Sequence, residues 1–528
     1  MGLNIDFLWD CAINEKGILI TRKEQTKLDA SNTNDKKMKM VRITLDHMQA
    51  GRPEDFPKPG DKFQKAAMPE GIGHGELYAD IVRIALPSLF ELILTQLTSM
   101  ADQIMVGRLP GEIGVQALSA VGLSAQPKML LMTMIMAMNV GSTAMVARFR
   151  GQGNRQKANQ VLRQSVFFNI VLSAFFMTVG LAFGENIIRF LAGSGISEST
   201  IQYASEYFRI QMYGMIPLSM TFSFTACLRG CGDTKMPLFY NTMANVVNIV
   251  FNYLLIYGKF GFPYMKVAGA SLATVLGQNV AFVIASCVVL SKTRFVYLDL
   301  KEKFYIDKDL LKSVITIGFP SMVEQLFMRA GVMIFTRTVA GLGDTAYATH
   351  QICMNIQSLS FMIGQAFSNG STTLVGQSLG KGRYDMADVY VRHTRHLGLI
   401  CAVALASFLF FFGGSVVWLY NETPEVVALG SKILMFVAFM QPFQNQQFIT
   451  NGGLRGAGDT KFSAMVIFIT VLLVRSGLAI LFINYLGLGL WGAWLAIFAD
   501  QMLRTLLIIC HYNTGKWRFM RAFNASEK

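Results

Sequence analysis

One acidic residue, Asp102, lies inside a stretch of the sequence that is otherwise long and apolar. The stretch covers roughly residues 84–107, long enough to cross a ~30 Å hydrocarbon core as a helix. A carboxylate costs on the order of 2.5–3.5 kcal/mol at the centre of such a helix and less near the interface. When desolvated, it can exchange a proton near neutral pH or bind Na⁺. Asp102 is therefore a candidate cation-coupling residue, the alternative being that it faces water near the outer leaflet.

Two amides in a later apolar stretch could take part in the same chemistry. Asn248 and Asn252 are four residues apart, which places them on one face of a helix. In general, amide oxygens can ligate a cation and amide N–H groups can hydrogen-bond a carboxylate. The alternative is that these polar groups only join one helix to another.

Other charged residues also fall in or beside apolar stretches. Glu91 and Glu324 each follow a proline by four residues, near the start of a span. Either could line a vestibule that attracts cations, or be a half-solvated interface residue. For Arg475, Asp500 and Arg504 we expect structural pairing, because Asp500 and Arg504 stand four residues apart and Arg475 can pair within its bundle.

These residues must be positioned by membrane helices. The 528-residue chain is 52% hydrophobic and only 15% charged, with a mean hydropathy of +0.40. Beyond about residue 84 it contains about twelve apolar stretches, and in lipid such stretches must be helical to satisfy their own backbone hydrogen bonds. The predicted spans are 84–107, 117–146, 165–190, 200–227, 237–258, 267–290, 313–338, 346–376, 397–419, 428–453, 463–486 and 490–511. The expected fold class is an all-α polytopic membrane protein.

The formal charge of +14 is distributed unevenly along the chain. If the loops are numbered alternately from a cytoplasmic N-terminus, most Lys and Arg residues fall on one side. This positive-inside bias predicts a multi-pass cell-membrane protein with both termini in the cytoplasm, and it accounts for the charge without nucleic acid. The polar N-terminal segment, with mixed charges and few aromatics, is expected to be a mobile tail. The predicted divisions are an N-terminal tail (1–75), a first bundle (76–291), a connector (292–312), a second bundle (313–511) and a C-terminal tail (512–528).

The chain repeats several phrases in the same order. LRGCGDT (228–234) returns as LRGAGDT (454–460), and three other phrase pairs recur at similar spacings of roughly 223 to 233 residues. The other pairs are LPSLFE with FPSMVE, GQGNRQKAN with GKGRYDMAD, and GASLATVLGQ with GAWLAIFADQ. The chain therefore divides into two homologous halves of six spans. An even number of spans gives both halves the same orientation, with a pseudo-two-fold axis along the membrane normal and a cavity between them.

The LRGxGDT phrase itself predicts a turn. It lacks the GxxxxGK[ST] spacing of a phosphate loop, and no strand precedes it. Its glycines permit a tight reversal. We expect Asp233 and Thr234 in the first copy, and Asp459 and Thr460 in the second, to cap the helix that follows.

With these phrases, the chain resembles the multidrug and toxic compound extrusion (MATE) family of cation-coupled exporters over roughly residues 80–511. The anchors are both LRGxGDT turns, ADQIMVGRLP (101–110), NIVFNYLLIYG (248–258), GASLATV and VRSGLA (474–479). The resemblance implies two six-helix bundles that work by alternating access. It also implies an efflux antiporter that exchanges H⁺ or Na⁺ inward for amphipathic, often cationic, drugs or metabolites outward.

The resemblance also implies residue roles. Asp102 matches the family's aspartate before x-x-M-V-G, and Thr274 matches an oxygen ligand of some members. Asn248 and Asn252 fall on an Asn-x-x-x-Asp pattern in which Asn252 replaces the acid. Gln444 stands where some sodium-driven members carry an acid, so the predicted cation-coupling set is in the first half: Asp102, Asn248, Asn252 and Thr274. The predicted substrate-cavity set is Glu324, Glu91, Gln278 and Met134.

Other classes fit the sequence less well. A lipid or lipid-linked sugar flippase of the same superfamily remains the alternative, although the basic residues are expected to stay in loops. An enzyme would need converging His, Cys or acidic clusters, and the histidines show no metal-ligand spacing. We expect no metal and no cofactor, with H⁺ or Na⁺ as the coupling ion. The expected partners are small-molecule substrates and the lipid bilayer, and the expected oligomeric state is a monomer.

Overall fold

The structure is a computed structural model of the whole chain. It describes residues 11–13, 19–21, 44–51, 66–69, 71–110, 112–192, 196–299, 301–302, 305–420 and 423–519. Most of the predicted N-terminal tail and the last nine residues of the C-terminal tail lie outside these ranges.

The first half of the chain forms one bundle of long helices. Its elements are α4 (His74–Gly107), α5 (Glu112–Gly151), α6 (Arg155–Ala192), α7 (Glu198–Tyr213), α8 (Met215–Gly230), α9 (Lys235–Tyr257) and α10 (Lys266–Leu290). The helices α7 and α8 follow one another with only Gly214 between them, so together they replace the single predicted span 200–227.

The second half forms a matching bundle. Its elements are α11 (Lys308–Ala340), α12 (Asp344–Gly380), α13 (Tyr384–Tyr420), α14 (Pro424–Gly456), α15 (Lys461–Ile467), η3 (Phe468–Arg475), α16 (Ser476–Ile480), η4 (Leu481–Tyr485) and α17 (Gly489–Asn513), followed by η5 (Lys516–Phe519). The run from α15 to η4 is continuous and alternates between α and π geometry. Counted as one segment, and with α7 and α8 as another, each bundle has six membrane segments, as predicted.

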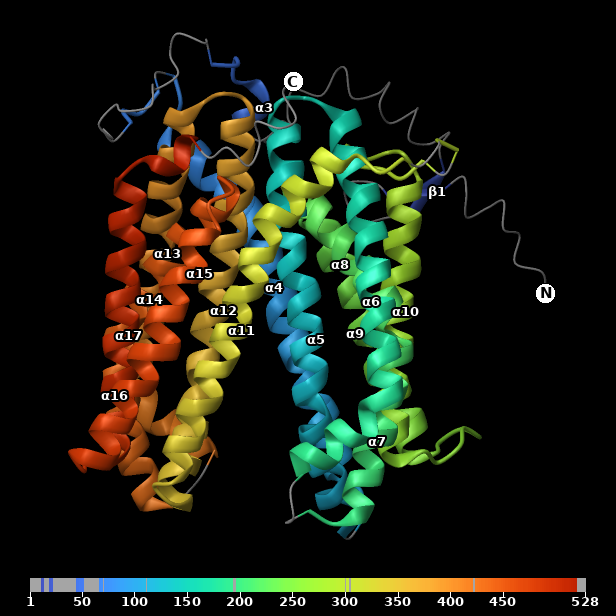
Figure 1. Cartoon of the computed structure of the whole chain (residues 1–528), viewed down its shortest axis with the longest axis vertical. Coiled ribbons are helices and arrows are strands. Elements are labelled where there is room, and N and C mark those ends of the chain that lie inside the picture. The colour runs from blue at the N-terminus through green and yellow to red at the C-terminus, as the bar shows by residue number, and fades with distance from the viewer. Residues whose placement is uncertain are drawn as a thin grey trace.

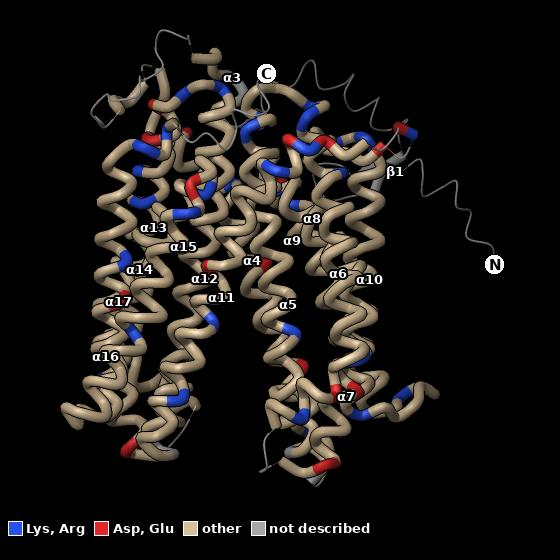
Figure 2. Tube along the Cα trace, in the orientation of Figure 1, with Lys and Arg blue, Asp and Glu red and all other residues tan. Residues whose placement is uncertain are grey.

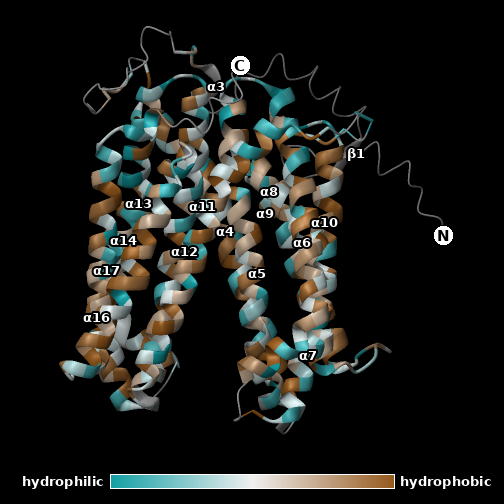
Figure 3. Cartoon of the chain, viewed as in Figure 1, coloured by the Kyte–Doolittle hydropathy of each residue, from teal (hydrophilic) through white to brown (hydrophobic). Residues whose placement is uncertain are grey.

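These helices differ in polarity. Among the described residues, seven segments are long and apolar enough to cross a membrane on hydropathy alone: α5, α6, α10, α13, α14, α15–η4 and α17. The segments α4, α7–α8, α9, α11 and α12 do not reach that threshold. Apolar residues cover much of the middle of the bundles and hydrophilic ones gather at the end that carries the LRGxGDT turns (Figure 3).

The two bundles converge at the end that carries the LRGxGDT turns and diverge toward the opposite end (Figure 1). We call these the basic end and the far end, because Lys and Arg gather at the first (Figure 2). Two glycines bring the bundles into contact there. A Cβ at Gly151 would lie 2.1 Å from the carbonyl oxygen of Gln377, and one at Gly380 would lie 2.0 Å from that of Arg148.

Deeper in the interface, α5 and α11 also approach each other closely. A Cβ at Gly141 would lie 2.3 Å from the Val314 carbonyl oxygen, and one at Gly318 would lie 2.7 Å from that of Met138. Backbones can approach this closely only where a residue has no side chain, which is the usual role of small residues between membrane helices. The bundles are therefore packed tightly against each other toward the basic end.

The duplicated LRGxGDT phrase forms the same turn twice. Gly232 and Gly458 both have φ of 85°, the left-handed conformation that glycine adopts without strain. The capping prediction is only partly right, because Asp233 accepts a hydrogen bond from the Met236 amide at 3.3 Å, whereas neither Thr234 nor Thr460 caps its helix.

The threonines instead join neighbouring helices. The Thr234 hydroxyl donates to the Arg83 carbonyl of α4 at 3.4 Å, and the Thr460 hydroxyl donates to the Ile317 carbonyl of α11 at 2.8 Å. In the second copy Asp459 lies 2.6 Å from His511 rather than on an amide of α15. A neighbouring helix thus provides partners that a reading of the local sequence could not include.

Part of the predicted N-terminal tail is packed against the basic end. The described segment includes α3 (Thr44–His47), while β1 (Cys11–Ile13) and β2 (Leu19–Thr21) form a small antiparallel pair. The Leu45 side chain is buried among residues of α4, α12 and α13. The Gly51 amide donates to the Lys381 carbonyl at 2.9 Å, and the Lys381 ammonium donates to the Met48 carbonyl at 2.9 Å.

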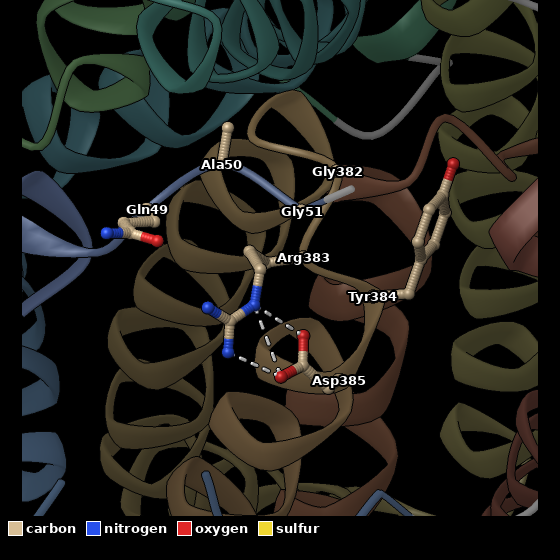
Figure 4. Close-up of a pocket in the computed structure, with 7 residues that line it drawn as sticks. All are labelled: Gln49, Ala50, Gly51, Gly382, Arg383, Tyr384 and Asp385. Carbon is tan, nitrogen blue, oxygen red and sulfur yellow. Dashed lines mark hydrogen bonds and ion pairs between the residues drawn. The ribbon is translucent and has the colours of Figure 1, made fainter. Parts of the chain in front are cut away.

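This segment closes one side of a cavity of about 440 Å³ over the turn between α12 and α13 (Figure 4). Arg383 and Asp385 form an ion pair of 2.6 Å on its other side. The Thr44 amide also donates to Asp80 of α4, at 2.9 Å. Residues 44–51 therefore contact both bundles at the end where they converge.

Candidate coupling site

Asp102 is held by α9, five residues before the end of α4. The side-chain amide of Asn252 donates to Oδ1 of Asp102. Asn252 is fully buried, whereas Asp102 is partly exposed. The carboxylate is thus fixed from one side by a buried amide and remains accessible from another.

Asn248 and Thr274 complete the cluster. When the Asn248 amide is oriented to satisfy its neighbours, its nitrogen donates to Asp102 Oδ1 at 2.8 Å. Its oxygen then accepts from the backbone amide of Thr274 at 3.3 Å and lies 3.2 Å from the Thr274 hydroxyl. All four residues predicted for cation coupling therefore lie in one hydrogen-bonded group, contributed by α4, α9 and α10.

The helices α4 and α9 are joined by a second hydrogen bond from an asparagine to a carboxylate, nearer the basic end. Asn241 of α9 donates to Glu91 of α4 at 2.6 Å. Glu91 precedes Asp102 by eleven residues, and Asn241 precedes Asn252 by the same number. Eleven residues complete about three turns, or roughly 16 Å of helix, so both carboxylates lie on one face of α4. The parallel course of α4 and α9 therefore explains why Asp102 meets Asn252.

Sequence reasoning missed a lysine beside this cluster. Lys128 lies within α5 and interacts electrostatically with Asp102. Its ammonium donates to Oε1 of Gln211 in α7 at 2.6 Å. The expectation that basic residues stay in loops is wrong here, and also for Arg329 within α11. Both interrupt apolar stretches, the signal that marked Asp102 and could have marked them as well.

Glu91 and Glu324 take equivalent positions in the two halves. The Glu91 carboxylate lies 2.8 Å from the guanidinium of Arg229, and that of Glu324 lies 2.6 Å from the guanidinium of Arg455. Each arginine belongs to the LRGxGDT turn of its own half. Ser463 donates a further hydrogen bond to Glu324, at 2.9 Å. Both carboxylates are buried, so the alternative in which they are half-solvated interface residues is wrong.

The other two residues predicted for the substrate cavity belong to the first bundle. Met134 of α5 packs against the apolar cluster that includes Ile135 and Phe208. The Gln278 amide oxygen of α10 lies 3.1 Å from the position of a Cβ at Gly214, between α7 and α8. Both of these contacts lie within the first bundle.

Three intramembrane charges of the second half, Arg475, Asp500 and Arg504, form one buried group. Asp500 accepts hydrogen bonds from Arg475 at 2.9 Å and from Arg504 at 2.6 Å. The predicted i, i+4 pair is thus present, and Arg475 joins it. Gln444, which stands at the family's second acidic position, lies 3.5 Å from the Gln357 amide. Among the residues that the structure describes, no three His, Cys, Asp or Glu side chains come together as a metal site.

Comparison with known proteins agrees with this architecture. The family model MatE matches residues 87–254 and 320–481, once in each bundle. The chain is 30% identical over 450 residues to the probable multidrug resistance protein NorM of Thermotoga maritima, covering 84% of this chain and 93% of that protein. It is 26% identical over 436 residues to the multidrug resistance protein MdtK of Yersinia pestis, covering 81% and 93%.

Solved structures have the same fold. A MATE crystal structure in the bent conformation aligns with a TM-score of 0.76 at 21% identity, over 86% of this chain and 97% of that one. A multidrug resistance MATE family transporter in an outward-facing conformation aligns with a TM-score of 0.76 at 22% identity, with the same coverage. The segments matched by the family model include Asp102, Asn248 and Asn252 and both carboxylate–arginine pairs, whereas Thr274 lies outside them. This chain therefore belongs to the MATE family of multidrug efflux transporters, which are multi-pass membrane proteins and not enzymes, and which need no cofactor.

Proposed function

We propose that this protein is a secondary active antiporter that exports amphipathic, often cationic, drugs or metabolites in exchange for H⁺ or Na⁺. The observation that carries the coupling half of this proposal is the cluster of Asp102, Asn252, Asn248 and Thr274. A partly exposed carboxylate fixed by buried amides can take up a cation from water at low reorganisation cost. It lies on one bundle, so its charge state can bias how the two bundles pack.

We infer that the basic end faces the cytoplasm. Lys and Arg gather there, which is the distribution that membrane insertion favours on the cytoplasmic side (Figure 2). Both termini are then cytoplasmic, and the bundles are packed together on the inner side and apart on the outer side (Figure 1). This is the arrangement from which a substrate leaves the cell and a coupling ion enters.

Alternating access would require the contacts at the basic end to break. Thr373 of α12 donates to the Arg229 carbonyl at 2.9 Å, and Gln377 donates to the Gly230 carbonyl at 3.0 Å. These bonds join the second bundle to the LRGxGDT turn of the first. The ion pairs of Glu91 with Arg229 and of Glu324 with Arg455 lie within single bundles, so they would keep each turn rigid while the bundles separate.

The four residues predicted for the substrate cavity could contribute to substrate binding in different ways. Glu91 and Glu324 would attract a cationic substrate only weakly, because each carboxylate is already paired with an arginine. Gln278 and Met134 offer an amide and a polarizable thioether, which suit varied ligands. A monomer is sufficient for the cycle, because both bundles belong to one chain.

One observation favours the flippase alternative. Arg329 follows Gly318 by eleven residues, hence three turns later on the face of α11 that contacts α5. Within the described part of the chain, no ion pair or hydrogen bond is found for its guanidinium, and Nε is buried. A guanidinium on that face would suit the phosphate of a lipid.

The test is ethidium efflux from proteoliposomes under a proton gradient alone and then a sodium gradient alone. Efflux under either gradient supports the antiporter. No efflux under both, with movement of a fluorescent anionic phospholipid between leaflets, would replace it with the flippase.

A further inference from the structure

We propose that Lys128 is a tethered counter-cation for Asp102 that makes the coupling site selective for protons over sodium. The proposal rests on the coupling role of Asp102 and decides between the two ions left open above. It depends on three features: the groups turned toward the carboxylate, the anchoring of the lysine, and the charge balance of the pair.

The first feature is the orientation of the amides. A sodium ion needs several oxygen atoms directed at one point, as hard cations do generally. Here Asn252 and Asn248 both direct N–H groups at Asp102 Oδ1. The Asn248 oxygen is turned to Thr274, and the Thr274 hydroxyl donates to the Ala270 carbonyl at 2.9 Å. With Asn248 in the orientation that satisfies its hydrogen-bonding neighbours, both amides thus direct donors, and not oxygens, at the carboxylate.

The second feature is a hydrogen-bonded support for Lys128. Its partner Gln211 donates to the Ser271 carbonyl of α10 at 3.2 Å, and the Ser271 hydroxyl donates to the Tyr207 carbonyl of α7 at 2.7 Å. The Tyr207 side chain in turn interacts with Thr274 of the Asp102 cluster. The lysine is thus anchored to α7 and α10, the second of which also carries Thr274 of the Asp102 cluster.

The third feature is charge. The titratable groups that interact with Asp102 are Lys128 from α5 and Tyr207 from α7, while α9 and α10 present amides and a hydroxyl. The ammonium already balances the carboxylate, so Na⁺ would have to displace it or share the same oxygens. A proton needs no ligand shell: it leaves hydronium in the outer water and forms an O–H bond on Asp102, and the released ammonium keeps its bond to Gln211.

The experiment measures Na⁺ binding to the purified full-length protein as a Na⁺-dependent shift in thermal unfolding, at fixed pH and ionic strength, with choline as the replacement ion. Wild type should show no shift specific to Na⁺. Lys128→Gln should gain Na⁺ affinity of about 10- to 100-fold, because the positive charge that interacts with Asp102 and repels a second cation has been removed. Lys128→Arg keeps the positive charge and should therefore still exclude Na⁺. Lys259→Gln removes one exposed positive charge at the far end and should behave as wild type.

A Na⁺-specific shift in wild type that equals that of Lys128→Gln would overturn the proposal. If Lys128→Gln does not fold, the wild-type result and Lys128→Arg still decide it, since both must exclude Na⁺. The coupling role of Asp102 is tested separately: gradient-driven transport that survives in Asp102→Asn removes that role, whereas Na⁺ exclusion by Lys128 concerns binding alone.

Discussion

The Asn252 amide donates a hydrogen bond to the Asp102 carboxylate and joins α9 to α4 near the far end of the first bundle. The acid expected at position 252 from the family pattern is thus replaced by a donor that stabilises the single remaining carboxylate. The site holds one acid, one nearby ammonium and neutral polar groups, which is a sparse set for a coupling centre. Changes to any member should therefore have separable effects.

Removal of the amide should weaken coupling without removing the acid. Asn252→Leu leaves Asp102 with one fewer donor, and loss of a hydrogen bond to a charged group costs roughly 1.5–3 kcal/mol. Ethidium efflux driven by a gradient should fall about tenfold or more, which corresponds to ~1.4 kcal/mol. Asn252→Gln, which keeps an amide, serves as the matched control and should retain more activity. Equal loss in the two variants would contradict a specific role for the donor.

The ion pair of Glu324 with Arg455 should stabilise the second bundle only as a pair. Glu324→Gln leaves the mostly buried guanidinium of Arg455 without its carboxylate, and breaking a buried pair typically costs about 3–5 kcal/mol. The melting temperature in detergent should drop, and Glu324→Gln with Arg455→Gln should recover part of the loss. Transport of cationic and neutral substrates separates the two roles of Glu324. A selective loss for cations would assign it to the substrate cavity, and an equal loss would leave it a structural residue.

The contact between Gly151 and Gly380 should control how the bundles meet. A methyl group at Gly380 would lie 2.0 Å from the Arg148 carbonyl oxygen, so Gly380→Ala must separate the bundles at the basic end. A cysteine introduced at Gln377 should then react faster with a water-soluble maleimide than it does in the parent protein. Gly477→Ala is the control, because its Cβ would meet no atom within 4 Å. Unchanged labelling in Gly380→Ala would show that the closed end tolerates the methyl group.

The segment 44–51 should depend on Lys381 for its position. Methionine has no hydrogen-bond donor in its side chain, so Lys381→Met loses the hydrogen bonds to the Leu45 and Met48 carbonyls. Amide hydrogen exchange in residues 44–51 should accelerate, while exchange in α12 and α13 should stay near the wild-type rate. Arg383→Met, which changes the same turn but not these bonds, provides the comparison. Equal rates in the wild type and Lys381→Met would mean that burial of Leu45 is sufficient.

The helical fold was largely predictable because most membrane segments leave a local apolar signal, although α4, α7–α8, α9, α11 and α12 do not stand out by hydropathy alone among the described residues. Long apolar stretches located the spans, and the repeated phrases placed six in each half. Asn248 and Asn252 could be assigned to one face from their spacing. Their meeting with Asp102 came from the family pattern, since 146 residues separate Asp102 from Asn248.

The partners of charged residues were less predictable. Glu91 and Arg229 are 138 residues apart, and nothing in the sequence near either names the other. The position of Thr460 against α11, and of Asp459 against His511, likewise depends on how helices pack and not on the turn itself. Lys128 could have been predicted, because a lysine within the apolar stretch 117–146 contradicts the expectation that basic residues stay in loops.

The most direct test of the account is gradient-driven ethidium efflux by Asp102→Asn in proteoliposomes, measured beside wild type under an imposed proton gradient. We predict that the variant binds ethidium with near wild-type affinity but loses the efflux that the gradient drives. Efflux at the wild-type rate in Asp102→Asn would contradict it, because the cluster around Asp102 would then carry no coupling ion.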